Sequence, residues 1–265
     1  MKYSDLQNLM SKYGIYPKKS LGQNFLVDEN ILNKIIEAGE IGKCEKVLEI
    51  GPGLGFLTGK LIEKGAKVTA LELDTGLIEL LKHEHKEAEV INIDALKYDP
   101  PAGPYKIVAN IPYYITSPLI SHFLEAKNKP SRMVLLVQKE VAEKICAREG
   151  DLNVLAIHVQ IYGKPEIAAK VSRECFYPAP NVDSSIIKID VFEKPLVDNP
   201  EKLLKAVHAG FAHKRKTLFN ALIRGLTNLK PEQIKEILKQ CGIDEMRRAQ
   251  TLSIDEWKKL SKTLL

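Results

Sequence analysis

The chain has 265 residues with a formal net charge of +5 and a pI near 8.8. This length allows one large domain plus a small one, and the mild positive charge favours a polyanionic partner such as a nucleic acid. No stretch is apolar for long enough to span a membrane, and the N-terminus lacks the pattern of a signal peptide. The four cysteines show neither C-x-x-C nor Cys/His spacing, so we expect no metal site, no disulfide framework, no membrane partner and a cytoplasmic protein with reduced thiols.

The N-terminal segment has two parts. Residues 4–14 predict a short helix that ends at Gly14, and a basic, glycine-containing loop follows over residues 17–26, before a helix capped by Asp28. The loop has the composition of a solvated linker. Its apolar pair at 25–26 indicates instead that the segment folds onto another part of the protein.

Residues 46–55, Lys-Val-Leu-Glu-Ile-Gly-Pro-Gly-Leu-Gly, predict a buried strand, a tight turn and the start of a helix. A dinucleotide-binding turn has the spacing G-x-G-x-x-G and faces a pyrophosphate. Here Gly51, Gly53 and Gly55 give G-x-G-x-G, and Glu49 precedes them. A carboxylate at this position would repel a pyrophosphate and favour a cationic ligand, and S-adenosylmethionine (SAM), with its sulfonium and ammonium groups, fits. Taken alone, the turn is equally consistent with a strand-to-helix connection that binds nothing.

Two further predicted strands also end in acidic residues. Residues 68–74 place Glu72 about twenty residues beyond the glycines, where a carboxylate can accept from both ribose hydroxyls. Glu72 is also a candidate cap for the next helix, although Asp74 suits that role. Residues 89–94 end at Asp94. The three acids are expected along one edge of an α/β sheet, where such sheets bind ligands.

A fourth strand over residues 106–110 runs into the most specific motif of the chain, Asn110-Ile111-Pro112-Tyr113. An amide oxygen and a backbone carbonyl can accept the hydrogens of a planar amine while an aromatic ring stacks on it. The alternative is an ordinary proline turn with a core tyrosine. Beyond it, we predict a helix capped by Ser117, a strand over 133–138 and a helix over 139–146.

Two more strands are predicted over residues 167–171 and 185–191. The proline-rich residues 176–184 between them are expected to form a loop, with Phe176 either a second stacking surface or a core residue. A change in composition at 193–195 divides the chain into domains 1–195 and 196–265. The second domain carries four helical patterns, over residues 200–208, 216–224, 231–240 and 254–264.

Basic residues gather at two places in the second domain. His213, Lys214, Arg215 and Lys216 lie at a predicted helix start, and Arg248 lies in a second basic pair. Such clusters are usually solvated. Cations at a helix N-terminus oppose the helix dipole, however, so the first cluster indicates an external anion such as RNA phosphate.

Taken together, these motifs resemble the ribosomal RNA adenine dimethyltransferases, in particular their small-subunit branch. The matching segments occur in the same order over nearly the whole chain: residues 21–26, 49–55, 72–74, 94–95, 110–113, 138–143, 176–180, 211–218 and 248–253. The resemblance implies a Rossmann-like SAM-dependent methyltransferase fold, with a mostly parallel seven-stranded sheet and helices on both faces, plus a small all-α C-terminal domain.

The resemblance also implies site residues. Cofactor contacts fall to Gln23, Asn24, Leu26, Glu49, Gly51, Gly53, Glu72, Asp94, Ala95 and Asn110, and catalytic contacts to Asn110, Ile111, Tyr113 and Phe176. RNA contacts fall to Lys18, Lys19, His213, Lys214, Arg215, Lys216 and Arg248. The target adenine is expected to flip out, to lie between Tyr113 and Phe176, and to donate N6 hydrogens to Asn110 and to the Ile111 carbonyl.

The implied activity is transfer of two methyl groups to N6 of each of two adjacent adenosines near the 3′ end of 16S rRNA, by a monomer that acts late in small-subunit biogenesis. Three alternatives remain: a large-subunit rRNA methylase of the macrolide-resistance type, an assembly factor that acts mainly by binding, and a dehydrogenase. Two departures affect the expected docking of RNA. Asn181 stands where the family usually has Lys, and residues 148–156 lack the usual basic elements.

Overall fold

The computed structural model describes residues 3–213 and 215–264. The chain forms two compact units, one of residues up to 142 together with 164–193, and another of residues 143–163 together with those from 194 onward. The second unit therefore takes in a segment that the proposed division at residue 195 leaves in the first domain. That division stays a proposal.

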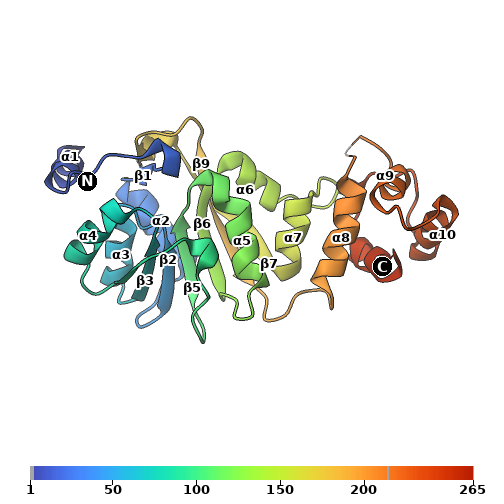
Figure 1. The fold of residues 1–265 in the computed structure, drawn as a ribbon, viewed down its shortest axis with the longest axis horizontal. Helices are drawn as coiled ribbons and strands as arrows, with labels where there is room; N and C mark the ends of the chain where they lie inside the picture. The colour runs from blue at the N-terminus through green and yellow to red at the C-terminus, as the bar shows by residue number, and fades with distance from the viewer. Residues whose placement is uncertain (1–2, 214, 265) are drawn as a thin grey trace. The chain divides into compact units, whose positions relative to one another are not determined.

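The first unit contains a seven-stranded sheet in the order β4-β3-β2-β5-β6-β9-β7 (Figure 1). Its strands are β2 (Lys46–Ile50), β3 (Lys67–Glu72), β4 (Glu89–Asn92), β5 (Lys106–Asn110), β6 (Arg132–Gln138), β7 (Gly163–Val171) and β9 (Ser184–Val191). Strands β4, β3, β2, β5 and β6 are parallel, whereas β9 runs antiparallel to β6. The predicted mostly parallel sheet is confirmed, and the parallel strands bring their carboxyl ends to one edge.

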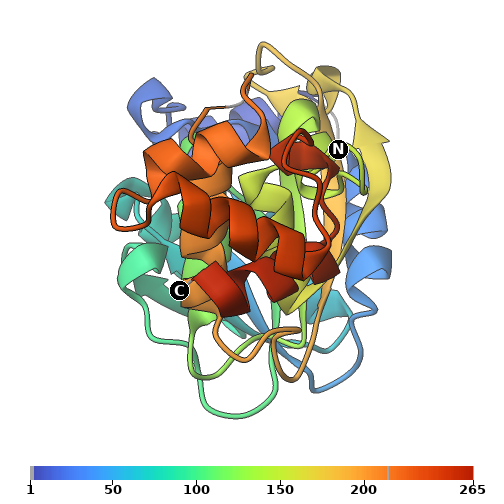
Figure 2. The ribbon, with the colours of Figure 1, turned by 90° about the vertical axis from the view of Figure 1, so that its right-hand side faces the viewer.

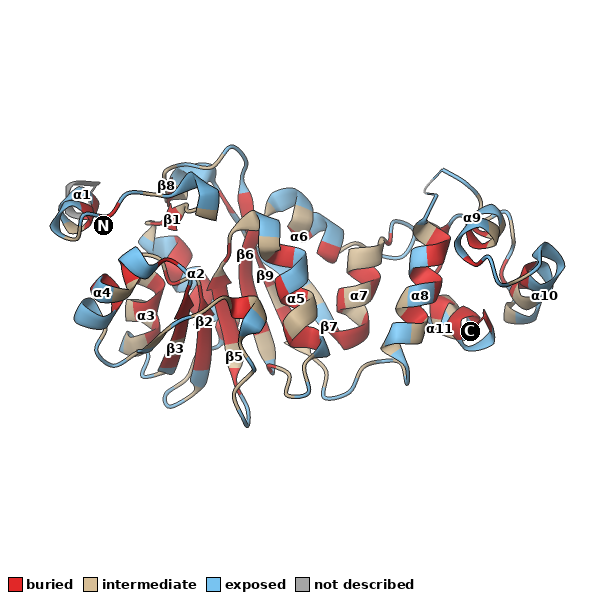
Figure 3. Ribbon diagram, viewed as in Figure 1, coloured by how far each residue is buried: buried red, intermediate tan, exposed pale blue. Residues whose placement is uncertain are grey.

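Helices cover both faces of this sheet, as predicted. They include α2 (Glu29–Gly39), α3 (Phe56–Glu63), α4 (Thr75–Glu84) and α5 (Thr116–Glu125), and α6 (Lys139–Ile145) follows β6. Helix α1 (Tyr3–Lys12) lies away from the sheet in Figure 1, and its Leu6 and Met10 share a core with Leu77 and Leu80 of α4. Apolar residues of α2 and α3 share one core with Val47, Val108 and Val134. Alternation turns Leu48 and Ile50 to the opposite face, and α5 lies in front of the sheet in Figure 1. The inner strands β2, β3, β5, β6 and β9 are mostly buried, whereas the edge strands β4 and β7 are largely exposed or half-buried, and the helices are exposed on one side (Figure 3).

Two predictions about local structure are wrong. The expected loop over 176–184 begins with a strand, β8 (Phe176–Tyr177), which pairs antiparallel with β1 (Phe25–Leu26). This pairing joins segments 150 residues apart in the sequence, and it confirms that the N-terminal segment folds back onto the protein. Helix α5 begins at Thr116 without a side-chain cap, so Ser117 is not its cap.

The second unit is helical. It contains α7 (Val154–Tyr162), α8 (Pro200–Phe211), α9 (Leu218–Gly225), α10 (Pro231–Cys241) and α11 (Ile254–Leu264), the last four coloured orange to red in Figure 2. The sequence prediction missed α7. Trp257 of α11 is fully buried and stacks on Phe211 at a ring-centroid distance of 5.9 Å. Within the described residues, no helix combines the length and apolarity needed to cross a membrane.

Candidate functional site

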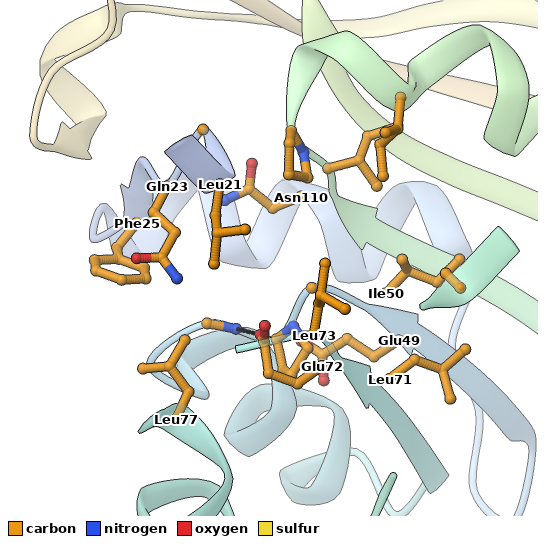
Figure 4. A pocket seen from close by; sticks show the side chains of 18 of the residues that line it. Leu21, Gln23, Phe25, Glu49, Ile50, Leu71, Glu72, Leu73, Leu77 and Asn110 are labelled. Atoms are coloured by element: carbon orange, nitrogen blue, oxygen red, sulfur yellow. Dashed lines mark hydrogen bonds between the residues drawn. The ribbon is translucent and has the colours of Figure 1, made fainter. Parts of the chain in front are cut away.

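A cavity of about 320 Å3 lies at the carboxyl ends of β2, β3 and β5 (Figure 4). All ten predicted cofactor residues line it: Gln23, Asn24, Leu26, Glu49, Gly51, Gly53, Glu72, Asp94, Ala95 and Asn110. The predicted catalytic residues Ile111 and Tyr113 line it as well, whereas Phe176 is absent from its lining. The structure thus gathers residues from five separate stretches of sequence around one space.

The glycine turn forms the floor of this cavity. Gly51, Gly53 and Gly55 all have left-handed backbone angles, with φ of 67°, 59° and 83°. A β-carbon on Gly51 would lie 3.3 Å from the Asn110 carbonyl oxygen, and one on Gly53 would lie 3.0 Å from the Phe25 ring. Only glycine adopts these angles without strain, so the turn lets the backbone approach a ligand closely.

Glu49 is buried, with 1% of its surface exposed. One carboxylate oxygen, Oε2, accepts a 2.6 Å hydrogen bond from the Thr58 hydroxyl, while Oε1 is buried without a partner in the described part of the chain. Burial, with a smaller contribution from the charge of Glu72, raises the pKa of Glu49 to about 8. A cationic ligand with an N–H group could donate a hydrogen bond to Oε1, and its positive charge would offset the cost of burying the ionised carboxylate. SAM carries both an ammonium and a sulfonium group, so the site fits SAM.

Glu72 lies across the glycine turn from Glu49 and is 7% exposed. Its two oxygens accept backbone hydrogen bonds from Gly53 (3.2 Å) and Asp74 (2.8 Å). Burial raises the pKa of Glu72 although these bonds lower it. Each oxygen keeps a second lone pair, which can accept a ribose hydroxyl. The cap of α4 is Asp74, which accepts from Gly76 at 2.9 Å, as predicted.

Asp94 and Ala95 complete the wall beyond Glu72. Asp94 caps a 3-10 turn over Ala95–Lys97 by accepting a 3.0 Å hydrogen bond from Leu96. Ala95 is buried. The second Asp94 oxygen keeps the capacity to accept from an exocyclic amine.

The N-terminal segment closes the cavity from the other side. The Gln23 amide donates to Asp74 (2.8 Å), and the Lys18 ammonium forms an ion pair with the same carboxylate (2.5 Å). These bonds, together with the β1–β8 pairing, hold residues 21–26 over the cavity. Lys18 therefore anchors this segment, and its predicted contact with RNA stays a prediction.

Asn110 ends β5 on the side of the cavity opposite Glu72 (Figure 4). Its amide nitrogen donates a 3.1 Å hydrogen bond to the backbone carbonyl of Asn24. Since this bond fixes the nitrogen, the amide oxygen is left to accept from a ligand. Tyr113 follows in a 3-10 turn over Tyr113–Ile115, and its half-buried ring reaches Ser184 at 2.8 Å through the hydroxyl.

Phe176 lies elsewhere. Only 4% of its surface is exposed, and it packs in the core that α2 and α3 form with the sheet. The sequence allowed Phe176 to be either a second stacking surface or a core residue, and the structure shows a core residue. A stacking role would require β8 to separate from β1, and it stays a prediction.

All the residues predicted to contact RNA that the structure describes are exposed at the surface. Lys19, His213, Arg215, Lys216 and Arg248 are exposed, and Lys214 lies outside the described residues. The basic run lies between α8 and α9, because α9 begins only at Leu218 with Thr217 as its cap. The predicted helix start at Lys216 is therefore two residues early.

The sequence prediction missed several residues around the cavity. Thr58 hydrogen-bonds Glu49, and Leu21, Leu73 and Tyr114 line the cavity, the last two 52% and 63% exposed. Leu73 lies between two acids at a strand end, and Tyr114 directly follows the Asn110–Tyr113 motif. Both residues could have been predicted from their positions next to a motif.

Comparison with known proteins agrees with this geometry. Residues 16–264 match the family described as ribosomal RNA adenine dimethylase. The chain is 44% identical over 264 residues to ribosomal RNA small subunit methyltransferase A of Dehalococcoides mccartyi strain CBDB1, covering 96% of this chain and 90% of that protein. It is 42% identical to the protein of the same name from Clostridioides difficile strain 630, with 97% and 94% coverage.

Solved structures give the same result. A dimethyladenosine transferase from Plasmodium falciparum superposes with a TM-score of 0.79 at 31% identity, covering 89% of this chain and 95% of that one. The 23S rRNA methyltransferase ErmE gives a TM-score of 0.74 at 29% identity, covering 91% and 99%. The methyl donor of this chain is SAM, and the chain belongs to the ribosomal RNA adenine dimethylase family.

Proposed function

We propose that the protein dimethylates N6 of two adjacent adenosines near the 3′ end of 16S rRNA, late in the assembly of the small subunit. The observation that carries the proposal is the placement of Asn110. Its amide nitrogen donates a hydrogen bond to the Asn24 carbonyl (3.1 Å), and the residue lines the same cavity as Glu49, Glu72 and Tyr113. The small-subunit assignment is supported by the relatives from D. mccartyi and C. difficile, which carry that specificity in their names.

Asn110 has to prepare a poor nucleophile. The N6 lone pair of adenine is delocalised into the ring, so the amine attacks only when the nitrogen rehybridises. SAM supplies an already activated methyl group when bound. In the first transfer the Asn110 oxygen and the Ile111 carbonyl each accept one N6 hydrogen, and in the second transfer one of them accepts the hydrogen that remains. These hydrogen bonds localise the lone pair toward the methyl group. Correct placement of the two reactants supplies much of the rate acceleration.

Tyr113 provides the surface on which the flipped adenine stacks. Its ring lines the cavity three residues after Asn110. An aromatic face stabilises the positive charge that develops on the adenine ring and N6 during transfer. The product amine is acidic enough to lose its proton to water, so no strong general base is required.

RNA binding outside the cavity is assigned to exposed cations. Lys19 lies in the segment that closes the cavity, and Arg215, Lys216 and Arg248 are exposed in the second unit. Contacts of this kind neutralise phosphates and are weakened by salt. They position the RNA without selecting the base.

The test is transfer of tritiated methyl groups from SAM to unmethylated small subunits, with unmethylated large-subunit rRNA assayed in parallel. We expect label only in the small subunit. Label only in the large-subunit rRNA would assign the protein to the alternative branch, which is supported by the similarity to ErmE. Label in neither RNA would contradict the proposal and favour a role in binding alone.

A further inference from the structure

Ser184 holds the ring of Tyr113 from outside the cavity. The two hydroxyl oxygens lie 2.8 Å apart, and Ser184 has no exposed surface. Ser184 does not line the cavity, whereas Tyr113 does. Any effect of Ser184 on a ligand in the cavity therefore passes through the tyrosine.

Tyr113 needs such a support because its own segment is short. It lies in a three-residue 3-10 turn that starts without a side-chain cap. The Thr116 hydroxyl donates to the Tyr113 carbonyl (3.1 Å), and this bond fixes the backbone but leaves the ring free to rotate about its side-chain bonds. The hydrogen bond to Ser184 is the second attachment, at the opposite end of the residue.

The support itself is rigid. Ser184 is the first residue of β9, which pairs with β6 over seven consecutive positions from Ser184↔Gln138 to Asp190↔Arg132. Strand β9 lies between β6 and β7, so pairing with its neighbours limits the freedom of its first residue to move. The hydrogen bond therefore attaches the Tyr113 ring to the sheet as well as to its own short turn.

We propose that Ser184 is a positioning residue that fixes the Tyr113 ring at the angle needed to stack on the target adenine. This inference rests on the stacking role given to Tyr113 in the proposed function. Ser184 is not among the residues that line the cavity, which include Glu49, Glu72 and the glycine turn. We therefore expect its loss to slow methyl transfer without changing the affinity for SAM.

The neighbouring serine is a matched control. Ser185 is 1% exposed and belongs to the same strand, but alternation turns its side chain to the other face of the sheet. Ser185→Ala removes the same atom from an equally buried place. It therefore reports any general cost of losing a buried hydroxyl in β9.

The first experiment measures kcat for methyl transfer and the Kd for SAM in Ser184→Ala, Tyr113→Phe, the double variant and Ser185→Ala. Each of the first two variants should lower kcat about tenfold, the effect of one lost hydrogen bond. The double variant should show the same loss of about tenfold rather than a hundredfold, because both changes break one interaction. Multiplied effects in the double variant, or an equal loss in Ser185→Ala, would overturn the inference.

The second experiment needs no RNA. In a spectrum of protein labelled with 13C in the tyrosine rings, the Tyr113 signal is identified by its loss in Tyr113→Phe. We expect Ser184→Ala to shift or broaden this signal and Ser185→Ala to leave it in place. An unchanged signal in Ser184→Ala would refute the positioning role even if the wild-type protein methylates small subunits. A shifted signal with no transfer to either RNA would instead contradict the proposed function alone.

Discussion

The two ends of the cavity are built in opposite ways. The acidic end, which we propose binds the cofactor, consists of Glu49 and Glu72, which are almost fully buried and carry carboxyls whose pKa is raised. The opposite end consists of a neutral amide and two tyrosines, Asn110, Tyr113 and Tyr114, all at least partly exposed. At the acidic end, ionisation of either carboxyl is costly without a cation nearby, whereas the three residues named at the other end are uncharged.

This difference follows from what each end has to bind. Buried carboxylates are destabilising until a cation arrives, so the acidic end selects a ligand by its positive charge. The adenine has to enter, react at a neutral amine and leave. Neutral hydrogen-bond acceptors and an aromatic face recognise it without holding it tightly. The contrast predicts that substitutions at the two ends have separable effects.

The largest effect is expected at the neutral end. Asn110→Ala should reduce kcat by about a hundredfold or more, since it removes an acceptor that acts on the reacting nitrogen. The Kd for SAM should stay within about threefold, as expected for the loss of one weak contact. Single-turnover methyl transfer and isothermal titration of SAM measure the two quantities. Normal turnover in this variant would contradict the role of Asn110.

The converse effect is expected at the acidic end. Glu72→Ala should weaken SAM binding by about ten- to a hundredfold, because it removes a carboxylate placed to accept hydroxyl hydrogens. At saturating SAM, methyl transfer should recover most of its rate. Glu63→Gln, a change at an exposed residue of α3 (67% of its side chain), is the control and should change neither quantity. A Glu72→Ala protein that binds SAM normally but is inactive would reverse the assignment of the two ends.

Glu49 should make the ligand-free protein sensitive to pH. Its folded-state pKa is raised from 4.5 to about 8, so its stabilising contribution is complete below pH 4.5 and is lost as the pH rises through 8. Over this window the free energy of unfolding should fall by about 1.4 kcal/mol per pH unit relative to Glu49→Gln. Urea unfolding of both proteins at several pH values measures the difference, and parallel curves would show that the wild-type carboxyl titrates normally.

The smallest effect is expected away from the cavity. Arg248→Ala should raise the KM for the RNA substrate about threefold and reduce the slope of log affinity against log salt by about one phosphate contact. Binding of SAM and kcat should stay unchanged. The measurement is a salt titration of RNA affinity for the variant and the wild type. An unaltered slope would remove Arg248 from the RNA contacts.

Much of the sheet and of the acidic end could be predicted because their signals are local. Most of the parallel strands are short, largely apolar runs that end at a turn residue or a polar residue, as in residues 46–50 before Gly51 and 106–109 before Asn110. Parallel pairing brings those ends together without further information. The caps at Asp28 and Asp74 are local signals of the same kind, and both were predicted correctly.

At the neutral end, Asn110 and Tyr113 could be predicted from their motif, but the residues around them were less predictable because they come from distant segments. The β1–β8 pairing joins residues 25–26 to 176–177, and it buries Phe176 in a position that composition alone could not choose. Ser184 supports Tyr113 from 71 residues away. Helix α7 was missed for a different reason, since its residues are apolar on most sides and give no amphipathic period.

The most direct test is to count methyl groups on the product. Small subunits from cells that lack this activity are incubated with the protein and SAM, and their 16S rRNA is digested for nucleoside mass spectrometry. We expect N6,N6-dimethyladenosine at two residues per subunit with the wild type and none with Asn110→Ala. Methyl groups on another base, or equal dimethylation by Asn110→Ala, would contradict the proposed function.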